Sequence, residues 1–152
     1  MHHIGIIGAG DYGAQHARAL QVLDDVRIVA ASRTNADALA QFTAEFGCQG
    51  FTDYHALLAQ PDIDTVVIAT PHHQHTAIAL AAAQAGKHIL LEKPMAPTLA
   101  ECDQILAAAR AAGVKLMVGH TNRFASTYRI AKALIESGDM GRVVMGTAAM
   151  QK

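Results

Sequence analysis

Short apolar runs alternate along the chain with longer segments rich in alanine and leucine. The short runs predict six strands, at residues 3–7, 26–31, 49–52, 65–69, 88–91 and 115–118. The longer segments predict helices at 12–22, 75–85 and 127–137, one from a cap at Thr34 to Gly47, one from a cap at Thr98 to Ala112, and a short one before Pro61. Strands this apolar on both faces are typical of parallel sheets covered by helices. We therefore predict an α/β fold with a doubly wound parallel sheet and helices on both faces.

A seventh apolar run, at residues 142–150, does not fit this scheme. Six strands already complete a doubly wound unit, and an unpaired apolar strand would expose its hydrogen-bonding groups. We expect this run to begin a second sheet, the alternative being that it extends the edge of the first. The predicted organisation is thus one domain at 1–140, followed at 141–152 by the first strand of a second.

Composition narrows the class of protein. Of the 152 residues, 51% are hydrophobic and 16% are charged, and the net charge is −1. This balance is the opposite of a disordered chain, and the charges form no basic cluster for nucleic acid. The longest uncharged apolar stretch is too short to span a membrane, and the N-terminus lacks the basic region of a signal peptide. Because Cys48 and Cys102 form no disulfide pattern, we expect a soluble cytoplasmic protein.

A glycine-rich loop follows the first predicted strand and opens a helix. It reads Gly8-Ala9-Gly10-Asp11-Tyr12-Gly13, which is the GxGxxG pattern. In this context Gly8 permits a tight turn, Gly10 lets the backbone approach a pyrophosphate, and Gly13 allows close packing of helix on strand. The N–H groups at the helix start would then face the phosphates. We predict dinucleotide binding here, the alternative being a turn without a ligand.

The end of the second strand bears on the choice of nucleotide. NAD enzymes tend to place a carboxylate there to accept hydrogen bonds from the ribose hydroxyls. This chain instead carries Ser32, Arg33 and Thr34, and its next carboxylate is Asp37. An arginine and two hydroxyls suit a 2′-phosphate, so NADP is favoured over NAD. The alternative is that Arg33 stacks on the adenine or is a solvated surface charge.

Polar clusters follow three further strands at the same expected edge of the sheet. They are Thr70-Pro71-His72-His73-Gln74-His75, Glu92-Lys93-Pro94 and Gly119-His120-Thr121-Asn122-Arg123-Phe124. No carboxylate or cysteine lies near the histidines to complete a ligand set, so we expect no metal site. His16 and His55, on predicted helices, are read as packing or surface residues. Lys93 stands where a nicotinamide is expected, and its ammonium could stabilise a developing alkoxide; the alternative is an exposed lysine that begins a loop.

At these motifs the chain resembles the nucleotide-binding domain of the glucose–fructose oxidoreductase / inositol dehydrogenase / rhizopine-catabolism family (Gfo/Idh/MocA). The resemblance runs over essentially the whole chain, and the Glu-Lys-Pro after the fifth strand is its most specific part. It implies a Rossmann-type fold, a cis Lys93–Pro94 peptide and a catalytic role for Lys93. It further implies that Thr70, Pro71, His72, His75 and Glu92 lie along the cofactor and that Asn122 or Arg123 lies near the substrate. His72 stands where the family often has Asn.

The resemblance also implies an activity and partners. Family members transfer hydride to or from a hydroxyl or carbonyl of a sugar, polyol or similar small molecule. They carry a further C-terminal α/β domain that supplies the proton acceptor, and they usually form homo-oligomers. We therefore expect the chain to be the cofactor-binding part of such an NAD(P)-dependent oxidoreductase, inactive by itself.

Two alternatives remain open at this point. One is a stand-alone NADP(H)-binding module that senses redox state or regulates a partner. The other is an enzyme that uses the cofactor transiently for net hydrolysis, epimerisation or dehydration.

Overall fold

A computed structural model describes residues 1–147 of the chain. The chain divides into two compact units, Met1–Gly119 and His120–Lys152. The domain boundary expected at residue 140 stays a prediction.

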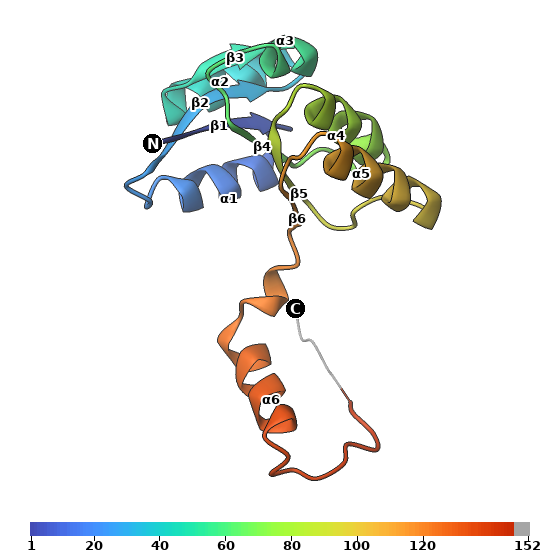
Figure 1. The fold of residues 1–152 in the computed structure, drawn as a ribbon. Coiled ribbons are helices and arrows are strands. Elements are labelled where there is room, and N and C mark those ends of the chain that lie inside the picture. Colours follow the sequence, from blue (N-terminus) through green and yellow to red (C-terminus); the bar gives the residue numbers. More distant parts are fainter. Residues whose placement is uncertain (148–152) are drawn as a thin grey trace. The chain divides into compact units, whose positions relative to one another are not determined.

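The first unit is a six-stranded, wholly parallel sheet with the strand order β3-β2-β1-β4-β5-β6. Its strands are β1 (His2–Ile7), β2 (Val26–Ser32), β3 (Gln49–Phe51), β4 (Thr65–Ile68), β5 (His88–Leu91) and β6 (Leu116–Val118). Its helices are α1 (Asp11–Leu20), α2 (Ala36–Phe46), α3 (Tyr54–Leu58), η1 (His72–Gln74), α4 (His75–Gln84) and α5 (Leu99–Ala111). The doubly wound α/β prediction is confirmed (Figure 1). The short helix η1, which directly precedes α4, was not predicted.

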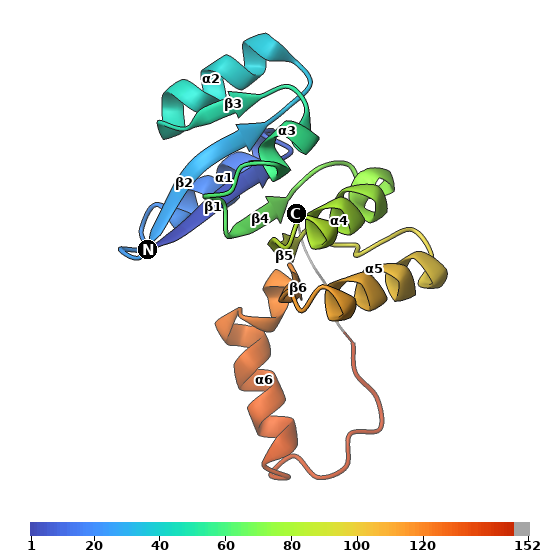
Figure 2. The ribbon, with the colours of Figure 1, turned by 45° about the horizontal axis from the view of Figure 1, so that its top comes forward.

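Helices cover both faces of this sheet (Figures 1 and 2). On one face Ile4 and Ile6 pack against Ala17 of α1 and Phe42 of α2. The opposite face holds a second core, which the helices α3, α4 and α5 cover, with Leu57, Ile78, Ala82, Ile105 and Val66 among its buried members. Because neighbouring residues of a strand point to opposite faces, a strand buried on both sides must be apolar throughout.

Two of the predicted helix ends agree with the structure, and a third differs. Thr98 caps α5, its hydroxyl accepting a hydrogen bond from the Glu101 amide at 3.3 Å. Gly47 ends α2 in the left-handed conformation, with φ 66°. The N-cap of α2, however, is Asn35, whose side chain accepts a hydrogen bond from the Ala38 amide at 2.8 Å, so the prediction of Thr34 was wrong by one residue. Asn and Thr both make good caps, and the path of the chain out of β2 decides between them.

The second unit contains η2 (Thr121–Arg123) and α6 (Ser126–Glu136). The helix predicted at 127–137 is confirmed. The strand predicted at 142–150 is not formed over 142–147, and the rest of it lies outside the described residues. A strand needs a partner to satisfy its backbone groups, and within 1–147 all six strands belong to the first unit. In the same range, no helix combines the length and the apolar character needed to cross a membrane.

Candidate functional site

The glycine loop joins β1 to α1 at the centre of the sheet, where the strand order reverses between β1 and β4. Gly8 has φ +96°, and a Cβ on it would lie 2.6 Å from the carbonyl carbon of Ala69. A Cβ on Gly13 would lie 2.4 Å from the Gly8 oxygen. Both positions therefore require glycine for the close approach of neighbouring backbone. Gly10 differs, because a Cβ there would meet no atom within 4 Å.

The open space at Gly10 lies before the N-terminus of α1. Gly10 is the N-cap residue and makes no side-chain capping bond. Its carbonyl oxygen accepts the bond from the Ala14 amide at 2.8 Å. The amides in the first turn of a helix have no acceptor within the helix. This loop thus presents free N–H groups and a positive dipole end to an open space, which is the arrangement that binds phosphate.

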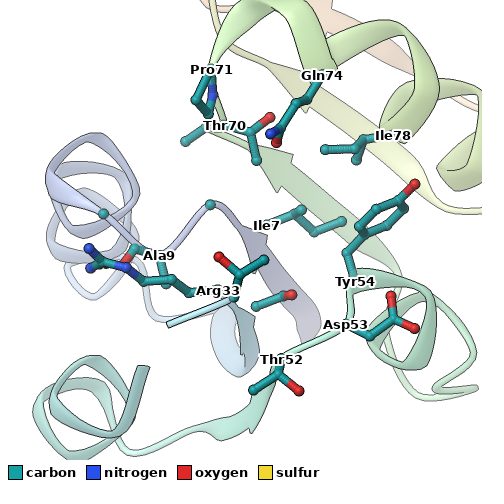
Figure 3. Close-up of a pocket in the computed structure, with 15 residues that line it drawn as sticks. Ile7, Ala9, Arg33, Thr52, Asp53, Tyr54, Thr70, Pro71, Gln74 and Ile78 are labelled. Carbon is teal, nitrogen blue, oxygen red and sulfur yellow. Dashed lines mark hydrogen bonds between the residues drawn. The ribbon is translucent and has the colours of Figure 1, made fainter. Parts of the chain in front are cut away.

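A cavity of about 480 Å³ lies at the carboxyl ends of β1, β2, β3 and β4 (Figure 3). Arg33 lines it, and its Nη1 donates a hydrogen bond to the Ala9 oxygen at 3.0 Å. The backbone oxygen of Ser32 accepts hydrogen bonds from the Gly8 and Ala9 amides at 3.0 and 3.1 Å. The end of β2 therefore holds the glycine loop in place. The lining residues are Ile7, Gly8, Ala9, Gly10, Ser32, Arg33, Thr34, Thr52, Asp53, Tyr54, Ala69, Thr70, Pro71, Gln74 and Ile78.

A second cavity, of about 370 Å³, shares part of its wall with the first. Its lining residues are Gly10, Asp11, Tyr12, Ala69, Thr70, Pro71, His72, Glu92 and Lys93. Glu92 and Lys93 follow β5 directly, and the Lys93–Pro94 peptide is cis, as the family resemblance implies. The two cavities have Gly10, Ala69, Thr70 and Pro71 in common, so they adjoin each other over the loop.

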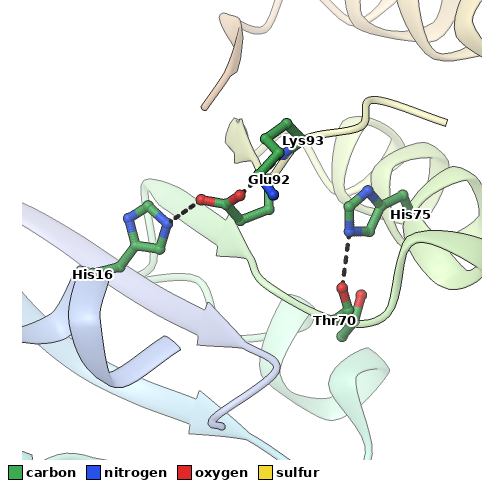
Figure 4. A network of polar contacts seen from close by, with 5 residues as sticks. All are labelled: His16, Thr70, His75, Glu92 and Lys93. Atoms are coloured by element: carbon green, nitrogen blue, oxygen red, sulfur yellow. Dashed lines mark hydrogen bonds and ion pairs between the residues drawn. The ribbon is translucent and has the colours of Figure 1, made fainter. Parts of the chain in front are cut away.

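Glu92 and Lys93 are contacted by α1. Glu92 is 9% exposed, and its Oε1 accepts a hydrogen bond from His16 Nε2 at 2.8 Å (Figure 4). Its Oε2 accepts one from the Lys93 amide at 3.1 Å. The Lys93 Nζ lies 5.8 Å from the centroid of the Tyr12 ring, within the range of a cation–π contact. The lysine is exposed toward the cavity side, whereas the glutamate is enclosed.

His75 is 1% exposed and lines neither cavity. Its Nδ1 lies 2.8 Å from the Pro94 oxygen and its Nε2 lies 2.9 Å from the Thr70 oxygen. The ring therefore links the loop after β4 to Pro94, the residue after Lys93, and Figure 4 shows its contact with Thr70. The resemblance implies that His75 lies along the cofactor, and this stays a prediction. The contacts of its ring in the structure are with two backbone oxygens.

The hydroxyl oxygen of Thr70 is a buried polar atom with no hydrogen-bond partner among the described residues. Thr70 lines both cavities, as Gly10 does, and Figure 3 shows it in the wall of the larger one. A buried hydroxyl without a partner is costly in free energy unless a ligand or water satisfies it. Together with the open space at Gly10, it fits a ligand that carries polar groups across the loop.

Asn122 and Arg123 belong to the second unit. They line a cavity of about 320 Å³ together with Tyr128, Arg129 and Lys132. This cavity is formed by η2 and α6 alone, and its cationic side chains come from one surface of that unit.

The remaining candidate groups do not build a metal or nucleophile site in the described part of the chain. Within residues 1–147, no three His, Cys, Asp or Glu side chains converge to hold a metal ion. Burial raises the pKa of the Cys48 thiol, with a smaller opposing effect of a backbone hydrogen bond, which disfavours the thiolate that a nucleophile needs.

Two groups of site residues escaped the sequence reasoning. Thr52, Asp53 and Tyr54 line the larger cavity directly after β3. Their signal in the sequence is their position directly after the short third strand, because ligands of such sheets bind at the carboxyl ends of the strands. His16, read as a packing or surface residue, bonds Glu92 across 76 positions of sequence, and no local pattern signals that pairing.

The strand order, the glycine loop at its reversal point and the hollow above that loop define a dinucleotide-binding domain of the Rossmann type. A family model described as the oxidoreductase family with an NAD-binding Rossmann fold, GFO_IDH_MocA, matches residues 2–120. The chain belongs to this family.

Individual relatives agree with this assignment. The chain is 41% identical over 141 residues to the 1-carboxy-3-chloro-3,4-dihydroxycyclo hexa-1,5-diene dehydrogenase of Comamonas testosteroni, covering 92% of this chain and 36% of that protein. It is 34% identical to the WlbA dehydrogenase of Bordetella pertussis, solved with NADH and UDP-GlcNAcA, with a TM-score of 0.89 over 93% of this chain and 41% of that one. The KijD10 3-ketoreductase of Actinomadura kijaniata, solved with NADP and TDP-benzene, is 28% identical, with a TM-score of 0.85 over 90% of this chain and 42% of that one. The chain thus spans about two fifths of the length of these relatives.

Proposed function

We propose that this chain binds NADP across the two joined cavities and is the cofactor-binding part of an oxidoreductase. The observation that carries the proposal is the shared wall of Gly10, Ala69, Thr70 and Pro71. It joins a cavity that contains Arg33 to a cavity that contains Lys93, across the N-terminus of α1. A dinucleotide needs this sequence of sites: one for the adenosine, one for the diphosphate and one for the reacting ring.

Each part of the hollow suits one part of the cofactor. The larger cavity, with Arg33, Thr52 and Tyr54, would take the adenosine. The free amides before α1 would bind the diphosphate. The smaller cavity, with Tyr12 and Lys93, would take the nicotinamide. The unpartnered hydroxyl of Thr70 lies in the wall that both cavities share and would bond to the bound molecule.

Lys93 is the residue that we propose to act on the substrate. When bound, the nicotinamide accepts or donates a hydride. The Lys93 ammonium would donate a hydrogen bond to the substrate oxygen and stabilise the negative charge that develops on it. His75 and His16 do not reach the cavity lining and would act on the backbone and on Glu92, as positioning residues.

The substrate class follows from the relatives rather than from the cavities. The names of the relatives describe dehydrogenases and a ketoreductase, one of them bound to a nucleotide sugar derivative. We propose a small hydroxyl- or carbonyl-bearing substrate of the sugar or polyol class, with Asn122 or Arg123 near it. Relatives bind NADH or NADP, so the preference for NADP rests on Arg33 and its hydroxyl neighbours Ser32 and Thr34.

The variant Gly10→Ala tests cofactor binding separately from folding. An alanine Cβ at this position meets no protein atom within 4 Å. The gain from a less flexible unfolded chain and the weaker N-cap oppose each other, so the free energy of unfolding should change by less than about 1 kcal/mol. The same methyl group would occupy the space that the diphosphate needs. The dissociation constant for NADPH, measured by titration of its fluorescence, should rise at least about tenfold.

Gly146→Ala is the matched control, because its Cβ also meets nothing within 4 Å and it lines neither cavity. It should leave the dissociation constant unchanged. Absence of NADPH binding to the unaltered chain would reject the proposal, and so would equal binding by Gly10→Ala.

A further inference from the structure

Two residues of α1, one helical turn apart, contact the Glu92–Lys93 dipeptide from the same side. His16 bonds the carboxylate of Glu92 at 2.8 Å (Figure 4). The ring centroid of Tyr12 lies 5.8 Å from the Lys93 ammonium. Residues four apart on a helix share one face. The helix that begins in the glycine loop therefore also fixes the residues that follow β5.

Each oxygen of the Glu92 carboxylate accepts one hydrogen bond. Its Oε1 is bonded to His16 and its Oε2 accepts the Lys93 amide hydrogen at 3.1 Å. A Cβ on Gly119 would lie 3.2 Å from Oε1, so the end of β6 closes the remaining side. Since a carboxylate only accepts, His16 Nε2 is the donor in this contact.

Lys93 is consequently left without a carboxylate partner, although an acidic side chain is its sequence neighbour. The ion pairs within 4.0 Å among residues 1–147 are His16–Glu92, Arg18–Glu45 and Lys132–Glu136, and none includes Lys93. Opposite charges on neighbouring residues attract and pair when their side chains turn toward each other. Two hydrogen bonds hold the Glu92 carboxylate in its place beside α1.

We propose that His16 is a positioning residue for Lys93: it holds the Glu92 carboxylate against α1 and so keeps it from pairing with the Lys93 ammonium. The ammonium then remains available for a substrate oxygen. This inference rests on the proposed function, because that function gives Lys93 its task. The contact itself is a property of this chain and is measurable without a substrate.

The test is the rate of acetylation of Lys93 relative to Lys115, an exposed lysine outside both cavities, in one reaction at mildly alkaline pH. Peptide mass spectrometry gives the ratio of the two rates. In His16→Phe the ring is kept and the donor is lost, so Glu92 can turn to Lys93. An ion pair favours the ammonium over the reactive amine, and the ratio should fall at least about threefold.

Two amide variants of His16 distinguish the loss of its hydrogen bond to Glu92 from a change in side-chain size. His16→Gln retains a donor near the position of Nε2, and its ratio should stay within about twofold of the unaltered chain. His16→Asn carries the same amide one carbon shorter, does not reach Glu92, and should behave as His16→Phe does. If His16→Phe does not fold, the comparison of His16→Gln with His16→Asn tests the proposal. Gln15→Ala, an exposed neighbour on α1, controls for changes in the helix and should leave the ratio unchanged.

A double variant distinguishes positioning from a merely structural role. Glu92→Gln removes the charge that would pair with Lys93, so adding it to His16→Phe should return the ratio to that of Glu92→Gln alone. An unaltered ratio in both His16→Phe and His16→Asn would overturn the inference. So would an equal fall in His16→Gln, or a fall that Glu92→Gln does not reverse.

NADPH titration of the same variants keeps this inference separate from the proposed function. His16 lines neither cavity, so its variants should bind NADPH within about threefold of the unaltered chain, the range of a small indirect effect. If even the unaltered chain fails to bind NADPH, the proposed function is rejected while the acetylation ratios still decide the role of His16.

Discussion

At the scale of single residues, Arg33 connects the end of β2 to the glycine loop and to the larger cavity. One of its guanidinium nitrogens donates to the Ala9 oxygen at 3.0 Å, and the group has further N–H donors for a ligand. Ser32 and Thr34 line the same cavity. Asp53 lines it too, but its Oδ1 accepts a hydrogen bond from the His55 amide at 2.9 Å as the cap of α3.

Arg33→Ser tests the choice of nucleotide. Hydrogen bonds to charged groups contribute about 1.5–3 kcal/mol, so loss of the guanidinium should raise the dissociation constant for NADP at least about tenfold. The constant for NAD should change less than about threefold, because NAD has no 2′-phosphate. Competition titrations against NADPH fluorescence measure both constants.

Arg27→Ser is the control for loss of one positive charge, since Arg27 is exposed on β2 and lines neither cavity. Arg27→Ser should change the dissociation constants for NADP and NAD only slightly. Equal affinity of the unaltered chain for NADP and NAD would contradict the preference for NADP.

At the scale of elements, the N-cap residue marks where each helix begins after the strand or loop before it. The cap of α2 is Asn35 rather than the neighbouring Thr34, and the cap of α5 is Thr98. The Thr98 hydroxyl also donates to the Glu101 carboxylate at 2.7 Å, which completes a capping-box-like pair. Which residue caps a helix therefore depends on the path of the backbone as well as on the residue type.

Asn35→Ala should lower the free energy of unfolding by about 0.5–2 kcal/mol, because the Ala38 amide loses its acceptor. Thr34, one residue earlier, makes no capping bond. Thr34→Ala should therefore change this free energy by less than about 0.5 kcal/mol. Urea unfolding followed by circular dichroism measures both. A larger effect at Thr34 than at Asn35 would show that the cap lies where the sequence alone had placed it.

At the scale of the whole molecule, the residues proposed to bind the cofactor all lie in the first unit, Met1–Gly119. Asn122 and Arg123, proposed to lie near the substrate, are in the second unit. The two sets of proposed contacts thus belong to different units of the chain. The family resemblance implies a further substrate-binding part, which we propose is also needed for turnover.

In a protein that joins this chain to such a substrate-binding part and turns substrate over, Lys93→Met should lower kcat at least about a hundredfold. This is the range that positioned acid–base groups contribute. Methionine keeps the length of the side chain and removes the charge. Steady-state kinetics at saturating cofactor provides the measurement.

Lys115→Met is the matched control for the loss of a lysine, and its kcat should equal that of the unaltered protein. A turnover by Lys93→Met within a few-fold of the unaltered protein would remove Lys93 from the mechanism.

Much of the fold was predictable because its signals are local. The apolar runs located all six strands, Gly47 and Thr98 marked helix ends, and the loop from Gly8 to Gly13 marked the turn after β1. The run at 142–150 forms no strand over 142–147, and a strand forms only beside a partner, so its assignment to a second domain stays a prediction. The division of the chain after Gly119 comes from its tertiary contacts, which composition does not show.

The sequence by itself determined the type of fold, the glycine loop and the strand ends where polar residues gather, since periodicity and turn chemistry are written in neighbouring positions. Only the tertiary structure decided that His75 contacts backbone rather than the cavity, that His16 holds Glu92 and that Tyr54 lines the larger cavity. These contacts join residues from different strands and helices. Their partners are chosen by the register of the sheet and the packing of helices on it, which no single stretch of sequence encodes.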